Sequence, residues 1–271
     1  MTPLVFAGLA AVTYGASDFY GGMATRRSDA TRVVLWSQVV GLMIGFVVAP
    51  LVGGAIGPAD VGWGMAAGLA GALGLVSLYR GLSTGRAAVV APMSGVLSGV
   101  IPAIVGFGLG ERPSTVTALG FGIAAIAVWL VSGGRLEKAS GFSLGAIAGL
   151  GFGFFFVFLS PIPETAGLWP LIPARSASIL VLLLIRRRAA GPALTRSTWA
   201  LITAVGVGDM LANVFILLAL QRGPLGEGAV VSSLYPAVTV VLSALILHER
   251  VRRYQWIGLA LAVVAMALIA G

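Results

Sequence analysis

The sequence predicts an all-α integral membrane protein of ten transmembrane helices, arranged as two inverted five-helix repeats. Of its 271 residues, 58% are hydrophobic and only 10% are charged, a balance that a soluble core cannot bury. The charged residues gather in short intervals, which leave apolar stretches of about 17 to 22 residues, long enough to cross a bilayer as helices. The second half of the sequence also repeats the first, and this repetition predicts the two-part arrangement.

Ten apolar segments lie between charged, Pro-rich or Gly-rich breaks. The first begins close to Met1 without a basic segment or a small-residue cleavage site, so we expect a retained helix and not a signal peptide. The expected spans are Pro3–Gly22, Val33–Val52, Val61–Tyr79, Ala87–Gly108, Thr115–Ser132, Gly141–Leu159, Leu168–Ile185, Trp199–Leu220, Glu227–Leu247 and Tyr254–Ala270.

The repeat appears when the sequence is shifted on itself by 138 residues. Glu111-Arg112 then meets Glu249-Arg250, and Ser94 meets Ser232. A Glu-Arg pair that recurs at one offset is a strong signal in a chain with only nine acidic residues. We therefore divide the chain into repeats at residues 1–134 and 139–271. Since each repeat holds five spans, an odd number, the second must enter the membrane from the opposite side.

The basic residues predict the orientation. Even-numbered loops and helix ends hold only Arg112, Arg175 and Arg222, so the odd-numbered loops carry the other fourteen of the 17 Lys and Arg residues. By the positive-inside rule, the odd loops face the cytoplasm and both termini lie outside it. The net charge of +8 is therefore expected to serve membrane topology, and no nucleic-acid partner is predicted.

The residue types needed for common enzyme chemistry are missing. Cysteine is absent and His248 is the single histidine, which excludes a disulfide framework, a thiol-ligated metal and a histidine-based catalytic or metal cluster. The spaced glycines Gly149, Gly151 and Gly153 lie inside an apolar span, where helix packing explains them better than a nucleotide site. We expect neither enzyme activity nor a cofactor.

Three charged residues are predicted deep in the membrane: Asp18, Arg175 and Asp209. A charge at this depth costs at least about 2.5 kcal/mol, so it should face a partner or an aqueous pathway. Asp209 and Arg175 lie on adjacent spans, where they form a structural pair or contact substrate or protons. Asp18 lies near the end of the first span, where it belongs either to the site or to the membrane interface.

Polar and aromatic residues inside the spans complete the predicted substrate site. A lone Ser or Asn often bonds a neighbouring helix instead of a ligand, and aromatic rings can form walls that hold a cationic or planar substrate. Asn213 lies four residues from Asp209, on the same helix face. The further candidates are the polar residues Gln38, Ser94, Asn213 and Ser232 and the aromatic residues Tyr14, Trp36, Tyr79, Phe155 and Tyr235.

Glycines and prolines inside the spans predict close packing and bends. Pairs at spacing four, such as Gly64/Gly68, allow helix backbones to approach closely, within one subunit, at a sliding surface or at a dimer face. Pro92, Pro102 and Pro236 are expected to kink their helices or to act as hinges. The two Glu-Arg pairs are interpreted as interfacial salt bridges, loop staples or gates.

This pattern resembles the EamA-type branch of the drug/metabolite transporter superfamily over essentially the whole chain. The likeness lies in Tyr14-Gly15 and Phe152-Gly153, in the small-residue fourth span of each half, and in the Gly-Glu-Arg-Pro and His-Glu-Arg sequences that follow it. The sequence departs from the family where Ser37 replaces the usual first-half counterpart of Arg175, and in its predicted outside termini. The resemblance implies a ten-helix fold around a central cavity.

Together these observations predict a secondary transporter of small metabolites such as amino acids or cationic and amphipathic compounds, acting by alternating access. The resemblance implies that it is an exporter. A non-transporting interaction or scaffold subunit of the membrane is the alternative. The expected location is the inner membrane, as a multi-pass protein in contact with lipid. The expected partner is the small-molecule substrate, and transport is either proton antiport through Asp209 or Asp18 or simple facilitated efflux. The protein is expected to be a monomer or a homodimer.

Overall fold

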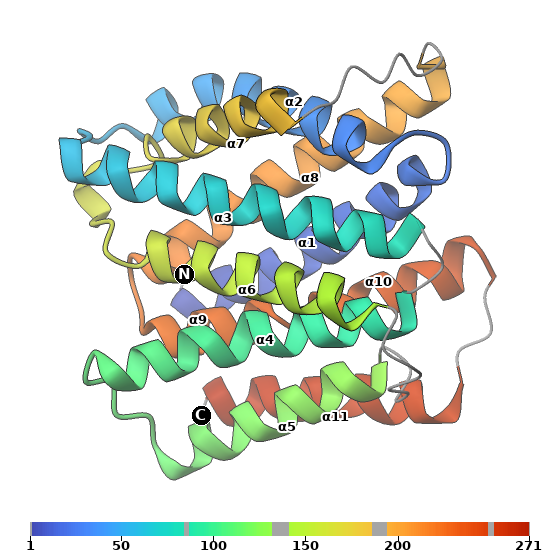
Figure 1. The fold of residues 1–271 in the computed structure, drawn as a ribbon. Helices are drawn as coiled ribbons and strands as arrows, with labels where there is room; N and C mark the ends of the chain where they lie inside the picture. The colour runs from blue at the N-terminus through green and yellow to red at the C-terminus, as the bar shows by residue number, and fades with distance from the viewer. Residues whose placement is uncertain (1, 84–86, 132–140, 186–193, 249–251, 271) are drawn as a thin grey trace.

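The computed structural model describes residues 2–83, 87–131, 141–185, 194–248 and 252–270. Within these ranges the chain is helical and contains no strand (Figure 1). The helices are α1 Pro3–Thr25, α2 Ala30–Val52, α3 Pro58–Ser83, α4 Ala87–Gly108, α5 Thr115–Val131, α6 Phe142–Leu159, the 3₁₀ turn η1 Glu164–Ala166, α7 Leu171–Ile185, α8 Arg196–Leu220, α9 Leu225–Ser232, α10 Tyr235–Ile246 and α11 Arg253–Ala270.

The helices are long and apolar enough for a membrane protein. In the described part of the chain, six candidate spans meet both length and hydropathy requirements, and shorter apolar helices cover Met93–Gly108, Thr115–Val131 and Leu171–Ile185. α1 is not among the six, and it carries Asp18. The six spans are Ala30–Val52, Pro58–Ser83, Phe142–Leu159, Arg196–Leu220, Leu225–Ile246 and Arg253–Ala270.

The ninth expected span, Glu227–Leu247, differs from the prediction because it is broken into α9 and α10. The break lies at Ser233 and Leu234, and Pro236 falls in the first turn of α10. A proline there loses no helical hydrogen bond, since the first N–H groups of a helix have no partner within it. Pro236 therefore follows a break instead of kinking a continuous helix. Pro102 lies inside α4, whereas the side chain of Pro92 and the Glu249-Arg250 pair are outside the described residues.

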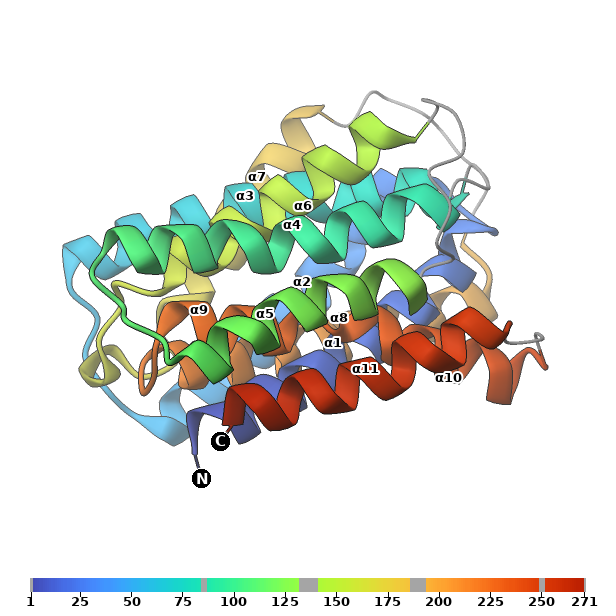
Figure 2. The same cartoon turned by 90° about the horizontal axis from the view of Figure 1, so that it is seen from below.

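The helices pack in matching pairs. Each contact has a counterpart when the two halves are interchanged. α1 packs against α8 as α6 packs against α3, and α2 packs against α8 as α7 packs against α3. α4 contacts α6 as α10 contacts α1, and α5 pairs with α11 (Figures 1 and 2). The first helix of each half also runs in the opposite direction to the other, as the traces of α1 and α6 show in Figure 1.

The two ends of the bundle differ in charge. At one end, which we call the basic end, α1, α3 and α7 finish and α2, α8 and α11 begin; Arg26, Arg27, Arg32, Arg80, Arg196, Arg252 and Arg253 lie there. At the other, the terminal end, α1 begins and α11 finishes (Figures 1 and 2). It carries Arg112 and Arg222, and Arg222 pairs with Glu164 at 2.7 Å.

Glycines bring helix backbones into contact. A Cβ on Gly68 of α3 would lie 1.9 Å from the carbonyl oxygen of Ala174 on α7, and one on Gly151 of α6 would lie 2.7 Å from the backbone nitrogen of Gly74 on α3. Such approaches leave no room for a side chain. The glycine at these positions therefore sets the distance between the helices that surround the centre of the bundle.

Buried apolar side chains form two clusters, one toward each end. The terminal-end cluster includes Leu159, Leu171, Leu217, Leu220 and Leu225. The basic-end cluster includes Val33, Val34, Leu78, Leu182 and Ile202. Members of both clusters, Phe155 and Phe156 of the first and Leu75 of the second, line the central cavity described below.

Candidate functional site

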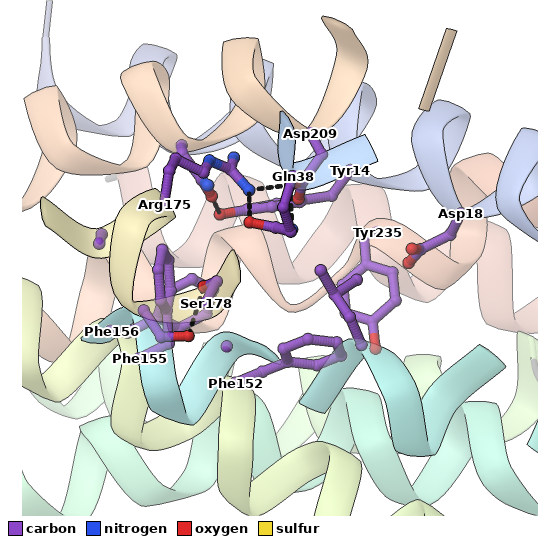
Figure 3. Close-up of a pocket in the computed structure, with 15 residues that line it drawn as sticks. Tyr14, Asp18, Gln38, Phe152, Phe155, Phe156, Arg175, Ser178, Asp209 and Tyr235 are labelled. Atoms are coloured by element: carbon purple, nitrogen blue, oxygen red, sulfur yellow. Dashed lines mark hydrogen bonds and ion pairs between the residues drawn. The ribbon is translucent and has the colours of Figure 1, made fainter. Parts of the chain in front are cut away.

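The central cavity is lined by residues from α1, α2, α3, α6, α7, α8 and α10 (Figure 3). About 560 Å³ of space free of protein atoms lies among these residues, part of it open solvent. Small residues of α3 and α7 border it together with charged, amide and aromatic side chains. Its lining residues are Tyr14, Asp18, Gln38, Gly68, Gly71, Leu75, Phe152, Phe155, Phe156, Ala174, Arg175, Ser178, Asp209, Asn213 and Tyr235.

A buried ion pair joins α7 to α8 at one side of the cavity. The Nη1 atom of Arg175 lies 2.5 Å from Oδ2 of Asp209 and also donates to Oε1 of Gln38 at 2.5 Å (Figure 3). The Nε2 atom of Gln38 donates to the same Asp209 oxygen at 3.4 Å. α2, α7 and α8 are thus held together by one charged network. The pairing alternative that the sequence left open for Arg175 and Asp209 is the arrangement present in the structure.

The guanidinium of Arg175 has donors left over. Its Nε and Nη2 atoms are buried and have no hydrogen-bond partner among the described residues. Gly41 of α2 makes room for the group, because a Cβ there would lie 3.3 Å from Nε. Buried N–H groups are normally satisfied, and an unsatisfied one costs roughly 1–3 kcal/mol. The leftover donors therefore suit an acceptor that enters the cavity, such as water or a substrate oxygen.

Tyr14 and Asn213 connect α1 to α8 across the cavity wall. The Tyr14 hydroxyl donates to Oδ1 of Asn213, which lies one helical turn beyond Asp209. Asn213 and Asp209 both line the cavity, as their spacing of four requires for two residues on one helix face. A polar stripe of α8 therefore faces α1 and the cavity.

Asp18 is a second buried carboxylate, and its surroundings differ from those of Asp209. It lines the cavity from α1, is 8% exposed, and accepts a long hydrogen bond of 3.5 Å from the hydroxyl of Tyr79. In the described part of the chain no Lys or Arg forms an ion pair with it. The carboxylate is directed toward the side of the cavity where Tyr235 lies (Figure 3). Asp18 is thus buried in the bundle, where it lines the cavity.

Aromatic rings line much of the remaining wall. Phe152 packs edge-on against Tyr235 with ring centroids 6.4 Å apart, and Phe155 packs against Phe156 at 5.8 Å. Tyr14 lies 6.3 Å from Phe156. The Tyr235 hydroxyl is 2.8 Å from the Ser94 hydroxyl, so the ring orientation is fixed from α4. The site combines apolar ring faces with a few charges, the pattern typical of a small-molecule pocket.

Eight of the twelve predicted site residues line the cavity: Tyr14, Asp18, Gln38, Phe155, Arg175, Asp209, Asn213 and Tyr235. The other four lie elsewhere. Trp36 packs against Trp199 at 5.2 Å, and the Ser232 hydroxyl donates to the Ala7 carbonyl at 3.3 Å. Ser94 and Tyr79 stand behind the lining and bond Tyr235 and Asp18, respectively. The sequence could not distinguish these supporting positions from direct ones.

Seven lining residues were not predicted as site residues: Gly68, Gly71, Leu75, Phe152, Phe156, Ala174 and Ser178. Helical spacing from predicted residues contained a signal for several of them. Phe152 precedes Phe155 by three residues and Phe156 by four, and Ser178 follows Arg175 by three residues. The glycines of α3 carried no such signal, because glycines in membrane helices are usually packing positions.

The residues around the cavity do not form a metal centre. Within the described ranges, no group of three or more His, Cys, Asp or Glu side chains is placed to hold a metal ion. The cavity chemistry is therefore that of hydrogen bonds, two carboxylates, one guanidinium and aromatic faces.

Apolar helices around a buried polar cavity define a multi-pass membrane protein, and comparison with known proteins agrees. Residues 139–271 match the model of the EamA-like transporter family. The family lies in the drug/metabolite transporter superfamily, so the match confirms the predicted resemblance over residues 139–271. The family supports a membrane transporter of this type.

Structural comparison identifies a similar fold over nearly the whole chain. A solved structure described only as "Crystal structure of protein" has a TM-score of 0.75 and 16% sequence identity, and the match covers 98% of this chain and 96% of that one. At this identity the likeness shows the fold alone. No curated protein matches the sequence significantly.

Proposed function

We propose that this protein is a secondary transporter whose central cavity binds a small amphipathic cation, most simply an amine that carries an apolar or aromatic group. The observation that carries the proposal is Asp18, a cavity-lining carboxylate without an ion pair among the described residues. Asp209, in contrast, is neutralised by Arg175. A buried carboxylate without a partner is costly unless it is protonated or paired, so Asp18 favours an incoming cation or a proton.

The charge balance of the lining supports the same class of substrate. The cavity wall contains two carboxylates, from Asp18 and Asp209, and one guanidinium, from Arg175. With all three ionised, a monovalent cation in the cavity would bring the site to neutrality. The aromatic rings of Tyr235 and Phe152 near this region would add cation–π attraction of about 0.5–2 kcal/mol.

Amino acids are included in the proposed substrate class. The buried Nε and Nη2 atoms of Arg175 lack a partner among the described residues and suit a carboxylate. An apolar amino acid could then place its ammonium toward an acidic side chain and its carboxylate toward Arg175. The amine remains the shared feature that the charge balance favours.

Alternating access between two halves is the proposed mechanism. The contact of α1 with α8 corresponds to the contact of α6 with α3 when the two five-span halves are interchanged, which supports two related halves. The opposite directions of α1 and α6 support inverted repeats (Figure 1). In this proposal α9 and α10 together form one span, which gives ten spans around a shared central site.

The proposal also covers the location of the protein, its orientation, its coupling ion and its oligomeric state. We place the protein in the inner membrane, with the basic end in the cytoplasm and both termini outside, because described cations gather at the basic end. Export with a proton as the exchanged ion is consistent with a carboxylate that binds either a proton or an amine. A monomer contains the whole cavity, and a homodimer would leave it unchanged.

Ligand-induced stabilisation tests the substrate class. Purified protein would be heated with phenethylamine, phenylalanine or hydrocinnamate, which share a phenyl group and differ in charge. A ligand that binds the folded state raises the unfolding temperature by mass action. The proposal predicts the largest increase with the amine and the smallest with the carboxylate. Asp18→Asn should remove the advantage of the amine, whereas Glu164→Gln, at an exposed pair, should retain it. A larger increase with hydrocinnamate would contradict the proposal.

A further inference from the structure

α9 is a short buried helix between the terminal end and the cavity. Seven of its eight residues are buried, and it packs against α1 and α4. The Ser232 hydroxyl at its end donates to the Ala7 carbonyl of α1 at 3.3 Å. The helix stops at Ser232, and Tyr235, three residues later, lines the cavity. A displacement of α9 would therefore reach the cavity through Tyr235.

The first turn of α9 is held by a residue from another part of the chain. Oε1 of Glu111 accepts from the Leu225 backbone N–H at 2.5 Å, and Oε2 accepts from the Gly226 N–H at 3.0 Å. The residue at the usual capping position, Pro224, makes no side-chain capping bond. Glu111 thus replaces a local cap with a carboxylate from the α4–α5 loop. A negative charge at this end is also favoured by the helix dipole.

The carboxylate occupies a niche that two glycines create. A Cβ on Gly106 would lie 2.3 Å from Oε2 of Glu111, and one on Gly226 would lie 3.1 Å from it. The loop is returned to this point by a hydrogen bond of 2.9 Å from the Glu111 N–H to the Gly106 carbonyl. Gly106, Glu111 and Gly226 therefore form one built contact between α4 and α9.

We propose that Glu111 is a positioning residue for transport: it fixes α9 in place over the terminal end of the cavity and, through α9, sets the position of Tyr235. The inference rests on the proposed function, since it assigns α9 a role in closing the transport cavity. A helix of eight residues is not stable by itself, so its position depends on packing and on this cap. Leu225, Ala229, Val230 and Val231 of α9 belong to the terminal-end cluster. Release of the cap should loosen that cluster above the cavity.

Cysteine labelling tests the closure directly. The natural sequence contains no cysteine, so a single Ala174→Cys change places one thiol on the cavity lining without background. Protein in sealed vesicles of known sidedness would be treated with a membrane-impermeant maleimide. A second single-cysteine protein, Ala55→Cys, in the exposed loop between α2 and α3, identifies the membrane side on which the terminal end lies.

In the Ala174→Cys protein, Glu111→Gln should raise the labelling rate from the terminal side by about tenfold, the effect expected when one charge-assisted hydrogen bond is lost. Glu164→Gln is the matched control, because Glu164 lies at the same end in an exposed pair with Arg222. It should leave the rate unchanged. Equal rates in the Glu111→Gln and Glu164→Gln proteins would overturn the inference.

A second pair of variants removes the cap while Glu111 stays in the sequence. Gly106→Ala would push the Glu111 carboxylate out of the niche, whereas a Cβ at Gly108 would meet nothing within 4 Å. Gly106→Ala should reproduce the faster labelling and Gly108→Ala should not. If Glu111→Gln does not fold, this pair decides the matter, and unchanged labelling in Gly106→Ala contradicts the proposal. The labelling requires no transport, so it remains decisive even if the amine proves not to be a substrate.

Discussion

The guanidinium of Arg175 and the carboxylate of Asp209 form an ion pair of 2.5 Å, with side chains only 4% and 6% exposed. Gln38 bonds both partners and adds α2 to the contact. The pair explains how two charges are accommodated at the level of the cavity. It also distinguishes the two acidic residues of the cavity, because Arg175 neutralises Asp209 and no Lys or Arg among the described residues forms an ion pair with Asp18.

Removing one partner of this ion pair should lower the free energy of unfolding more than removing both. Asp209→Asn leaves the Arg175 charge buried and unpaired, and we expect it to lower the free energy of unfolding by roughly 3–5 kcal/mol. Adding Arg175→Gln to Asp209→Asn should restore a large part of this loss. Thermal unfolding of the purified single and double variants measures both effects. A double variant as unstable as Asp209→Asn alone would show that the ion pair is not the source of the cost.

The close contact of α3 with α7 should not tolerate a methyl group. Gly68→Ala would place Cβ 1.9 Å from the Ala174 carbonyl oxygen, which belongs to a helix backbone and cannot turn away. We expect a loss of about 1–3 kcal/mol in unfolding free energy, as for other overpacked sites. Gly62→Ala in the same helix meets nothing within 4 Å and serves as the control. Similar stability of the two variants would contradict the importance of this contact.

The distribution of cations predicts the orientation of the chain. A reporter fused after Gly271 should be active outside the cytoplasm, as alkaline phosphatase is, because the described Arg residues gather at the opposite end of the bundle. The same fusion to a fluorescent protein that matures only in the cytoplasm should stay dark. Bright fluorescence from that fusion would reverse the proposed orientation without changing the cavity.

The sequence was sufficient to predict helices and the charged centre of the site for clear physical reasons. Apolar stretches between charged breaks identified the helical segments, and the membrane cost of a charge identified Asp18, Arg175 and Asp209. The spacing of four placed Asn213 beside Asp209 on one face of α8. These inferences need only composition and helical geometry.

Other features depend on contacts between distant segments, and the sequence could not supply them. Trp36 is as aromatic as Phe155, but its ring packs against Trp199 of α8 instead of lining the cavity. On either side of the break between α9 and α10, the Ser232 hydroxyl bonds Ala7 of α1 and the Tyr235 hydroxyl bonds Ser94 of α4, contacts that the sequence does not reveal. The recurring Glu-Arg pair was noticeable in the sequence, yet only the fold shows that Glu111 bonds the first turn of α9.

Transport of labelled phenethylamine into liposomes that contain the purified protein tests the central claim most directly. The wild-type protein and the Glu164→Gln control should show saturable uptake above that of protein-free liposomes. Asp18→Asn should reduce the uptake by roughly tenfold at low amine concentration, as expected when a charge-assisted contact is lost, while its unfolding temperature without ligand stays close to that of the wild type. Uptake by Asp18→Asn at the wild-type rate, or no uptake by any of the three proteins, would contradict an amine transporter centred on Asp18.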